Sequence, residues 1–244
     1  MLSGKTALIT GSNRGIGKAI LEKFLENGAD VICAVRKIDD KFSSYINLQS
    51  KKFNKDIKVL KFDLKNEAAI KKSLEILYTK KTIVDILVNN AGVPGGSLTE
   101  MTSIKSLREI FEINFFSQIK VTQLLLRLLK KSKNGSIINI GSISGLFAER
   151  GNLAYGSSKA ALMFATKIMA KEFSVYNIRV NSIAPTVTET DMLKKMDENA
   201  KDKLLKDANL KKPLSPMDVA NKALYLASDE TINISGQIIE INRE

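Results

Sequence analysis

The chain has 244 residues, 44% of them hydrophobic, and its 38 Lys and Arg residues against 26 Asp and Glu residues give a formal net charge of +12. This length and hydrophobic content suit a complete core and exclude disorder as the main state. The sequence has no His and a single Cys, Cys33. It therefore excludes Ser-His-Asp and Cys-His catalytic centres, zinc sites of the Cys/His kind and an intramolecular disulfide.

The positive charge does not predict a nucleic-acid partner. Lysines outnumber arginines by 31 to 7 and are spread along the predicted helices, whereas nucleic-acid-binding proteins usually gather arginines and stacking aromatic residues in one patch. No apolar run approaches the roughly 18 residues of a membrane span, and the first predicted strand begins too early to follow a secretory leader. We therefore expect a cytoplasmic protein without a nucleic-acid or membrane partner.

Short apolar or β-branched runs alternate with longer segments of helical periodicity along the chain. Strands are predicted at 6–10, 31–35, 58–62, 86–89, 136–140, 179–183 and 237–241. Helices are predicted between them, at 15–27, 43–53, 67–78, 104–131, 152–176 and 216–227. Each crossover is long enough for a helix, and strand 86–89 is apolar on both sides. The alternation therefore predicts an α/β fold, a Rossmann-like doubly wound parallel sheet of about seven strands with helices on both faces.

One domain is predicted over residues 1–244, because the four prolines and the lack of a low-complexity linker leave no boundary. The least regular stretch runs from about 186 to 215 and carries many charges. We expect it to form a substrate flap between the sixth strand and the last helix.

A glycine-rich turn follows the first predicted strand and opens the first predicted helix. Its residues are Gly11, Ser12, Asn13, Arg14, Gly15, Ile16 and Gly17. Free backbone N–H groups and the positive end of the helix dipole make such a turn an anion site. Gly11 permits the tight turn, Gly15 the close approach of a pyrophosphate, and Gly17 the packing of helix on strand. The spacing, Gly-x3-Gly-x-Gly, differs from the usual dinucleotide-binding Gly-x-Gly-x2-Gly.

Basic residues follow the second predicted strand. An NAD-binding protein usually carries a carboxylate at this place, which binds the ribose 2′-hydroxyl. The residues there are Arg36 and Lys37, and Arg14 lies inside the glycine turn. Guanidinium and ammonium groups suit a 2′-phosphate, so the pattern predicts NADPH rather than NADH. The alternative is that Arg36 and Lys37 are solvated loop residues. Asp39 and Asp40 lie beyond the strand and are interpreted as turn or helix-start residues.

Further motifs follow at regular places along the chain. They are Asp63 after strand three, Asn89-Asn90-Ala91-Gly92 after strand four, Asn114, Ser142, Tyr155-x3-Lys159, and Pro185 with Thr190. With the glycine turn, they resemble the short-chain dehydrogenase/reductase family over essentially the whole chain, and within it the 3-oxoacyl-(acyl-carrier-protein) reductases. Besides the turn and Arg36, the resemblance implies NADP contacts at Asp63, Leu64, Asn90, Ala91, Gly92, Tyr155, Lys159, Pro185, Val187 and Thr190.

The residue types themselves suggest the catalytic chemistry. Reduction of a ketone needs a proton donor, and without His the candidate is Tyr155, whose free pKa of about 10 needs a shift of about 3 units, or ~4 kcal/mol, to act near neutral pH. Lys159, four residues later on a predicted helix, shares its face and can stabilise a phenolate. Ser142 follows strand five at the sheet edge where ligands bind, and its hydroxyl can donate to the carbonyl oxygen. No metal site is predicted.

The resemblance adds two roles. The family residue at the place of Lys159 also holds the ribose hydroxyls, and the one at Asn114 positions a water that links the lysine to solvent. Other motif residues have structural alternatives: Asp63 as a helix cap, Asn89 and Asn90 as turn residues. Three aromatic residues are interpreted as core or subunit contacts, namely Phe111, Phe115 and Phe116, and Cys33 as an inert buried side chain.

The chain departs from the family pattern in two places. Thr186 follows Pro185 where the family usually has Gly, so the flap and the nicotinamide pocket can be arranged differently. The chain also ends without the usual Gly-Gly and apolar tail. This difference puts the family's usual contact between C-termini in doubt. Helices 104–131 and 152–176 resemble those that pair subunits in the family, and a homo-oligomer, dimer or tetramer, is expected.

The substrate is open at this stage. The first hypothesis is a 3-oxoacyl thioester on acyl-carrier protein, and the alternative is a sugar or polyol ketone. A third, less favoured hypothesis is an NADP-binding protein without turnover. Glu149 and Arg150, between Ser142 and Tyr155, suit a carrier arm or a polar ketone equally, whereas the flap residues Met192, Leu193 and Met196 favour an acyl chain. A run of basic residues has two interpretations: a surface that docks the carrier protein, or charges that offset the dipole at the end of a helix. Its residues are Arg127, Lys130, Lys131 and Lys133.

Overall fold

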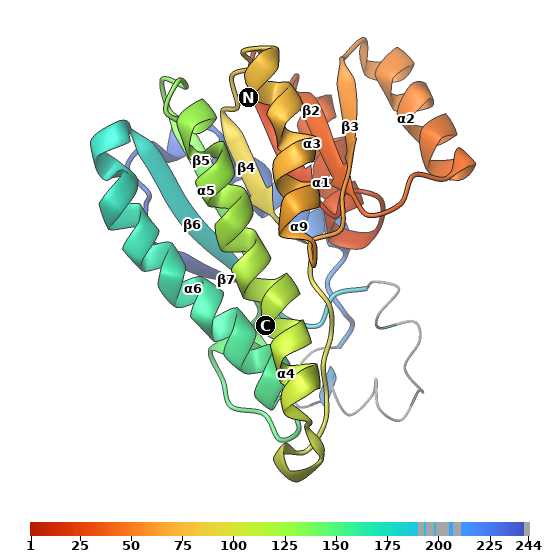
Figure 1. The fold of residues 1–244 in the computed structure, drawn as a ribbon, viewed down its shortest axis with the longest axis vertical. Helices are drawn as coiled ribbons and strands as arrows, with labels where there is room; N and C mark the ends of the chain where they lie inside the picture. Colours follow the sequence, from red (N-terminus) through yellow and green to blue (C-terminus); the bar gives the residue numbers. More distant parts are fainter. Residues whose placement is uncertain (190–192, 194–197, 199–204, 207–210, 242–244) are drawn as a thin grey trace.

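The protein is built around a single seven-stranded sheet (Figure 1). The computed structural model describes residues 1–189, 193, 198, 205–206 and 211–241. The strands lie in the order β3-β2-β1-β4-β5-β6-β7, and each neighbouring pair is parallel. Their bounds are β1 (Thr6–Thr10), β2 (Asp30–Val35), β3 (Ile57–Lys61), β4 (Ile86–Asn89), β5 (Gly135–Ile140), β6 (Ile178–Pro185) and β7 (Ile238–Ile241). The predicted parallel α/β sheet is confirmed.

Helices cover both faces of the sheet. Figure 1 shows α3 and α5 in front of the strands and α1 and α9 behind them. One face carries α1 (Gly15–Glu26), α2 (Asp40–Phe53) and α9 (Pro216–Ala227), and the other carries α3 (Glu67–Thr79), α5 (Ser117–Leu129) and α6 (Leu153–Phe173). Helix α4 (Ile104–Phe111) lies beyond the ends of the strands and packs against α6 (Figure 1). This arrangement is the doubly wound architecture that the strand-helix alternation predicts.

The alternation of side chains along each strand produces two cores. On β1, Ala7 and Ile9 pack with α1 and α9, whereas Leu8 between them packs with α3 and α5. On β2, Cys33 belongs to the first core, where it is completely buried. Neighbouring residues of a strand point to opposite faces, so apolar runs without polar alternation are what a sheet covered on both sides requires.

The predicted helix over 104–131 is confirmed as a helical segment over 104–129, but its middle has π-helical hydrogen bonding. Helix α4 ends at Phe111, a π-helical turn, η2, spans Glu112–Phe116, and α5 begins at Ser117. The apolar periodicity continues through the turn, so the pattern gives no sign of it. A π turn shifts the residues after it around the helix axis, and such turns are frequent at functional sites. Asn114 lies inside it.

Helix α2 also begins earlier than the predicted residue 43. The Asp39 side chain accepts a hydrogen bond from the Phe42 backbone N–H at 2.8 Å, which caps a helix that starts at Asp40. The interpretation of these two aspartates as helix-start residues is confirmed.

The strand order reverses between β1 and β4, at the carboxyl edge of the sheet. The chain runs outward from β1 to β3 and then returns to add β4 on the other side of β1. In α/β sheets, ligands bind where the strand order reverses in this way. The loops after β1 and β4 meet there, and the loop after β5 lies next to them.

Candidate active site

The glycine turn leaves the start of α1 open to an anion. Gly11 and Gly15 have φ angles of +68° and +53°, the left-handed region that favours glycine. No side chain caps the helix at Arg14, and its first turn has no acidic residue. In contrast, four other helices are capped by side chains, those of Asp39, Asn66, Ser103 and Ser215. Uncapped N–H groups at the positive end of the helix dipole suit a phosphate.

Close packing shapes the same turn. A Cβ atom on Gly17 would lie 2.2 Å from the Gly11 backbone oxygen and 2.4 Å from Asn90 Nδ2. The Ser12 hydroxyl is fully buried, and it lies beside the Cys33 thiol. The sequence predicted a close helix-strand contact at Gly17, and the position has no room for a side chain.

Asn90 ties the turn to the end of β4. Its Nδ2 donates to the backbone oxygens of Thr10 and Gly11, at 2.8 and 3.2 Å. The Thr10 hydroxyl oxygen accepts from the backbone N–H groups of Asn90 and Ala91, both at 3.0 Å. The amide of Asn90 thus holds the glycine turn in place. Nothing in its sequence neighbourhood indicated which groups it would bind.

Cationic side chains gather beside the glycine turn. Strand β2 pairs with β1 up to Thr10 and Ala34, and the Gly11 backbone N–H donates to the Ala34 oxygen at 2.8 Å. The residues that follow β2, Arg36 and Lys37, therefore lie next to the turn that carries Arg14, and all three are exposed. The nearby Asp39 is engaged in capping α2. These cations fit a phosphate better than a neutral hydroxyl.

Asp63 lies in the loop after β3, the next strand along this edge. Its Oδ1 accepts from the Lys65 backbone N–H at 2.9 Å, which closes a turn. Asn66, three residues later, is the residue that caps α3. The alternative interpretation of Asp63 as the helix cap is therefore wrong, although its carboxylate does stabilise the approach to the helix. Leu64, the other residue predicted there, is partly exposed.

Ser142, Tyr155 and Lys159 come together at the carboxyl end of β5. Ser142 begins the short 3₁₀ turn η3 (Ile143–Gly145), and its Oγ accepts from the Ser144 backbone N–H at 3.2 Å. Tyr155 and Lys159 lie on one face of α6, with Lys159 Nζ 5.8 Å from the centre of the tyrosine ring. The structure thus brings together three residues that the sequence spacing grouped.

The environment of these groups sets their protonation. Burial raises the pKa of the Tyr155 phenol, hydrogen bonding with Ser142 acts against this, and the charge of Glu149 raises the pKa further. Burial lowers the pKa of Lys159 to about 8, and its Nζ donates to the Ile140 backbone oxygen at 2.7 Å. The phenol therefore holds its proton at neutral pH. The expected lowering of the Tyr155 pKa beside Lys159 is not borne out, because burial outweighs the hydrogen bond that favours the phenolate.

Asn114 is completely buried, and its amide is committed to protein partners. Its Oδ1 accepts from the Val93 backbone N–H at 2.8 Å, and its Nδ2 donates to the Val93 oxygen at 3.0 Å and to Ser158 Oγ at 3.1 Å. Ser158 Oγ donates in turn to the Tyr155 backbone oxygen at 2.7 Å. Asn114 thereby joins the loop after β4 to the catalytic face of α6. Its predicted role in a water relay stays a prediction.

Gly92 lies between Asn114 and Lys159. A Cβ atom there would lie 3.2 Å from Asn114 Oδ1 and 3.4 Å from Lys159 Nζ. The loop after β4 therefore approaches both predicted catalytic side chains closely. This arrangement supports the prediction that residues 90–92 border a ligand at this edge.

The end of β6 completes the edge. Thr186, in the place of the expected Gly, is buried, and its backbone N–H donates to the Ile241 oxygen at 3.3 Å. Val187 is partly exposed, and its backbone oxygen accepts from Leu214 N–H at 2.8 Å. Leu193 is buried. Three predicted residues, Thr190, Met192 and Met196, lie outside the described residues.

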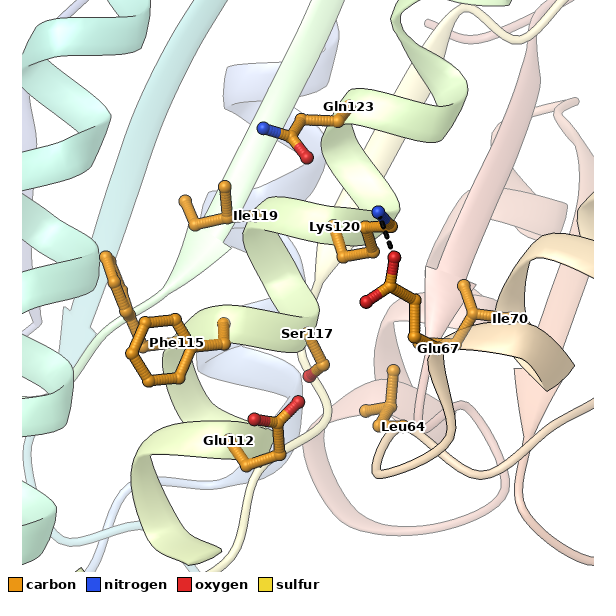
Figure 2. Close-up of a pocket in the computed structure, with 10 residues that line it drawn as sticks. Leu64, Glu67, Ile70, Glu112, Phe115, Ser117, Ile119, Lys120 and Gln123 are labelled. Carbon is orange, nitrogen blue, oxygen red and sulfur yellow. Dashed lines mark ion pairs between the residues drawn. The ribbon is translucent and has the colours of Figure 1, made fainter. Parts of the chain in front are cut away.

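A surface hollow of about 440 Å³ lies elsewhere, between the start of α3 and the η2–α5 segment (Figure 2). Figure 2 shows Lys120 reaching toward Glu67, with which it forms an ion pair. The predicted catalytic side chains do not line this hollow, and of the predicted nucleotide contacts only Leu64 does. Phe116, on its rim, is 53% exposed, so it is not part of the core.

Two further properties concern the described residues alone. Within these ranges, no group of three or more Cys, Asp or Glu residues is placed to hold a metal ion. No described helix is both long and apolar enough to span a bilayer.

Comparisons with known proteins agree with this geometry. Residues 5–201 match the short chain dehydrogenase family model. The 3-oxoacyl-[acyl-carrier-protein] reductase of Aquifex aeolicus is 35% identical over 241 residues, which cover 99% of this chain and 97% of the relative. The Escherichia coli reductase of the same name is 32% identical over 241 residues, or 98% of this chain and 96% of the relative.

A solved structure is also similar over nearly the full length. It is the L-sorbose reductase of Gluconobacter frateurii in complex with NADPH and L-sorbose, with a TM-score of 0.90 and 26% identity, covering 99% of this chain and 96% of the other. The family match, the relatives and the shared fold confirm the resemblance seen in the motifs. The chain belongs to the short chain dehydrogenase family.

Proposed function

We propose that the protein is an NADPH-dependent oxidoreductase that reduces a ketone to a secondary alcohol. The observation that carries this proposal is the convergence of Ser142, Tyr155 and Lys159 beside an uncapped helix start. The proposed catalytic unit is the single domain 1–244, with 186–215 as its substrate flap. Much of that flap lies outside the described residues.

Each catalytic residue has one proposed task. NADPH held at the carboxyl edge of the sheet would supply the hydride for the carbonyl carbon. Tyr155 donates its proton to the carbonyl oxygen as that oxygen gains negative charge, and Ser142 orients the oxygen by a hydrogen bond. Lys159 stabilises the resulting phenolate electrostatically, and Asn114 holds the loop after β4 against α6.

The proposed cofactor contacts follow the carboxyl edge of the sheet. The turn and the loop after β2 supply Gly11, Ser12, Asn13, Arg14, Gly15, Ile16, Gly17 and Arg36. The other loops and α6 supply Asp63, Leu64, Asn90, Ala91, Gly92, Tyr155, Lys159, Pro185, Val187 and Thr190. The exposed cations at Arg14, Arg36 and Lys37 support NADPH over NADH.

Substitution of Arg36 tests the choice of cofactor. Arg36→Ala should weaken NADPH binding by about 10- to 100-fold, since charge-assisted hydrogen bonds to a phosphate are worth roughly 1.5–3 kcal/mol, and should leave NADH binding nearly unchanged. Nucleotide fluorescence titrations measure both affinities. Arg108→Ala, at an exposed arginine of α4, is the control. Equal losses for the two nucleotides would contradict the 2′-phosphate contact.

The substrate that we favour is a 3-oxoacyl thioester carried by acyl-carrier protein. The curated relatives that cover almost the whole chain at 32–35% identity carry this activity in their names. A sugar or polyol ketone is the second candidate, because the L-sorbose reductase shares the fold at a TM-score of 0.90. An NADP-binding protein without turnover is the third.

One substrate panel separates these candidates. Purified protein with NADPH is given acetoacetyl thioesters of acyl-carrier protein and coenzyme A, and keto-sugars such as L-sorbose, while NADPH absorbance is followed. Tyr155→Phe should lower turnover of the best substrate by about 10²- to 10⁴-fold, the usual contribution of a general acid, with NADPH affinity preserved. Tyr225→Phe, at a partly exposed tyrosine of α9, should retain activity. Wild-type inactivity across the panel would favour the non-catalytic hypothesis.

The cellular location, the assembly and the binding partners are also proposals. We expect a cytoplasmic homo-oligomer, dimer or tetramer, that takes a small or carrier-bound substrate and binds neither nucleic acid nor a membrane. Support for oligomers comes from exposed apolar side chains on the η2–α6 side of the molecule, at Phe116, Phe164 and Ile168.

A further inference from the structure

Glu149 connects the two segments that carry the proposed catalytic hydroxyl groups. It lies in the loop between η3 and α6, and its Oε2 accepts from Ser144 Oγ at 3.0 Å and from Asn152 Nδ2 at 2.7 Å. The Ser144 backbone N–H donates to Ser142 Oγ at 3.2 Å, and Asn152 immediately precedes the helix that carries Tyr155. One carboxylate oxygen therefore joins the Ser142 turn to the start of α6.

Backbone contacts hold the segments on both sides of Glu149. The Ser97 backbone N–H donates to the Gly151 oxygen at 2.7 Å, which ties the loop to the segment after β4. A Cβ atom on Gly156 would lie 2.5 Å from the Ser144 backbone oxygen, so η3 lies directly against α6. The Glu149 carboxylate is exposed to solvent and accepts hydrogen bonds from both segments.

Lys159 and Glu149 relate to Tyr155 in different ways. Lys159 Nζ lies 5.8 Å from the centre of the tyrosine ring, and Glu149 affects the phenol through its charge from the loop before α6. The Glu149 charge raises the pKa of the Tyr155 phenol, because a nearby negative charge disfavours the phenolate. The neighbouring charged residue of the loop, Arg150, is exposed. No motif of the family resemblance included Glu149.

We propose that Glu149 is a positioning residue that fixes the Ser142 turn against the start of α6 and places a negative charge that disfavours the Tyr155 phenolate. The proposal rests on the reductase function proposed above.

Glu149→Gln separates charge from position, since the amide oxygen can still accept from Ser144 and Asn152. We expect the alkaline limb of the kcat/KM profile for reduction to move to lower pH by about half a unit to one unit, because the phenol loses its proton more easily. Glu149→Ala, which removes both functions, should also lower kcat. Glu100→Gln, at an exposed glutamate of the 3₁₀ turn Thr99–Met101, is the matched control.

A direct titration tests the same point without a substrate. Phenolate absorbance is recorded against pH for the wild type and for Glu149→Gln, and the curve of the same protein with Tyr155→Phe is subtracted from each. The Tyr155 midpoint should be lower in Glu149→Gln. Equal midpoints, or a kcat of Glu149→Ala equal to that of Glu149→Gln, would overturn the inference. Wild-type inactivity on thioesters would instead contradict the proposed substrate, and the titration would still decide the role of Glu149.

Discussion

Lys159 is a buried cation held by a backbone carbonyl. Its side chain is 4% exposed, and its Nζ donates to the Ile140 oxygen at 2.7 Å. Burial lowers its pKa from 10.5 to about 8. Between these values the unfolded chain keeps the lysine proton and the folded protein has released it, so the free energy of unfolding rises with pH over this window.

A stability measurement on the nucleotide-free protein checks this prediction. Between about pH 7.5 and pH 9.5, the free energy of unfolding of the wild type should rise by about 2 kcal/mol relative to that of Lys159→Met, which has no titrating group at this site. Urea unfolding at both pH values gives the difference. Lys167→Met, at an exposed lysine of the same helix, should show a relative change below about 0.5 kcal/mol. A pH-independent difference for Lys159→Met would contradict the lowered pKa.

Single residues also show the limit of sequence reasoning. The types and spacing of Ser142, Tyr155 and Lys159 were sufficient to predict that they meet. The partners of Asn90 and Asn114 were not predictable, because an amide can bind any nearby donor or acceptor, and its neighbours come from other strands. The sequence shows the charge of Glu149. Its hydrogen bond with Asn152 and its effect on the pKa of Tyr155 depend on the fold of the loop.

The start of α1 depends on a close contact between elements. A Cβ atom at Gly17 would overlap the Gly11 backbone oxygen, 2.2 Å away, and Asn90 Nδ2. Gly17→Ala should therefore lower the free energy of unfolding by about 1–3 kcal/mol, the usual cost of overpacking, and should weaken NADPH binding by displacing the turn. Urea unfolding and nucleotide titration measure the two effects.

A glycine with space around it provides the comparison. A Cβ atom at Gly96 would meet its nearest atom, the Gly151 oxygen, at 3.8 Å. Gly96→Ala should change the free energy of unfolding by less than about 0.5 kcal/mol. If Gly17→Ala changed the free energy of unfolding as little as Gly96→Ala, the close contacts at Gly17 would not constrain the turn.

The π turn Glu112–Phe116 is the element that the sequence pattern missed. Apolar residues continue through it, so the pattern from α4 to α5 predicts an ordinary α-helix with 3.6 residues per turn. Asn114 is completely buried within this turn and hydrogen-bonds Val93. The contacts of Asn114 with the loop after β4 and with α6 belong to the tertiary structure, and the local sequence pattern does not indicate the π turn.

The molecule leaves an apolar surface on the side of α6. Phe164 and Ile168, one helical turn apart, are 65% and 45% exposed, and Phe116 of the π turn is 53% exposed. Apolar side chains grouped in this way are typical of a surface that pairs with another protein. This supports the proposed homo-oligomer, in which a second copy of the chain covers the surface.

A charge placed on that surface tests the assembly. Phe164→Glu should shift the protein to a smaller species, because pairing would bury the carboxylate among apolar groups. Chromatography with light scattering measures the mass. Leu48→Glu, at an apolar residue of α2 that is 62% exposed on the other face of the sheet, should leave the mass unchanged. An unchanged mass for Phe164→Glu would place the subunit contact elsewhere.

The sequence was sufficient for the parallel sheet, the glycine turn and the residue types of the site. These features have local causes: the periodicity of apolar side chains, the left-handed angles that glycine tolerates, and the lack of His, which makes Tyr155 a candidate proton donor. The folded structure was needed for the lowered pKa of Lys159 and for the π turn. It was also needed for the hydrogen bonds of Asn90 to the glycine turn and of Glu149 to Ser144. Each of these depends on burial or on partners brought from distant segments, which no local pattern records.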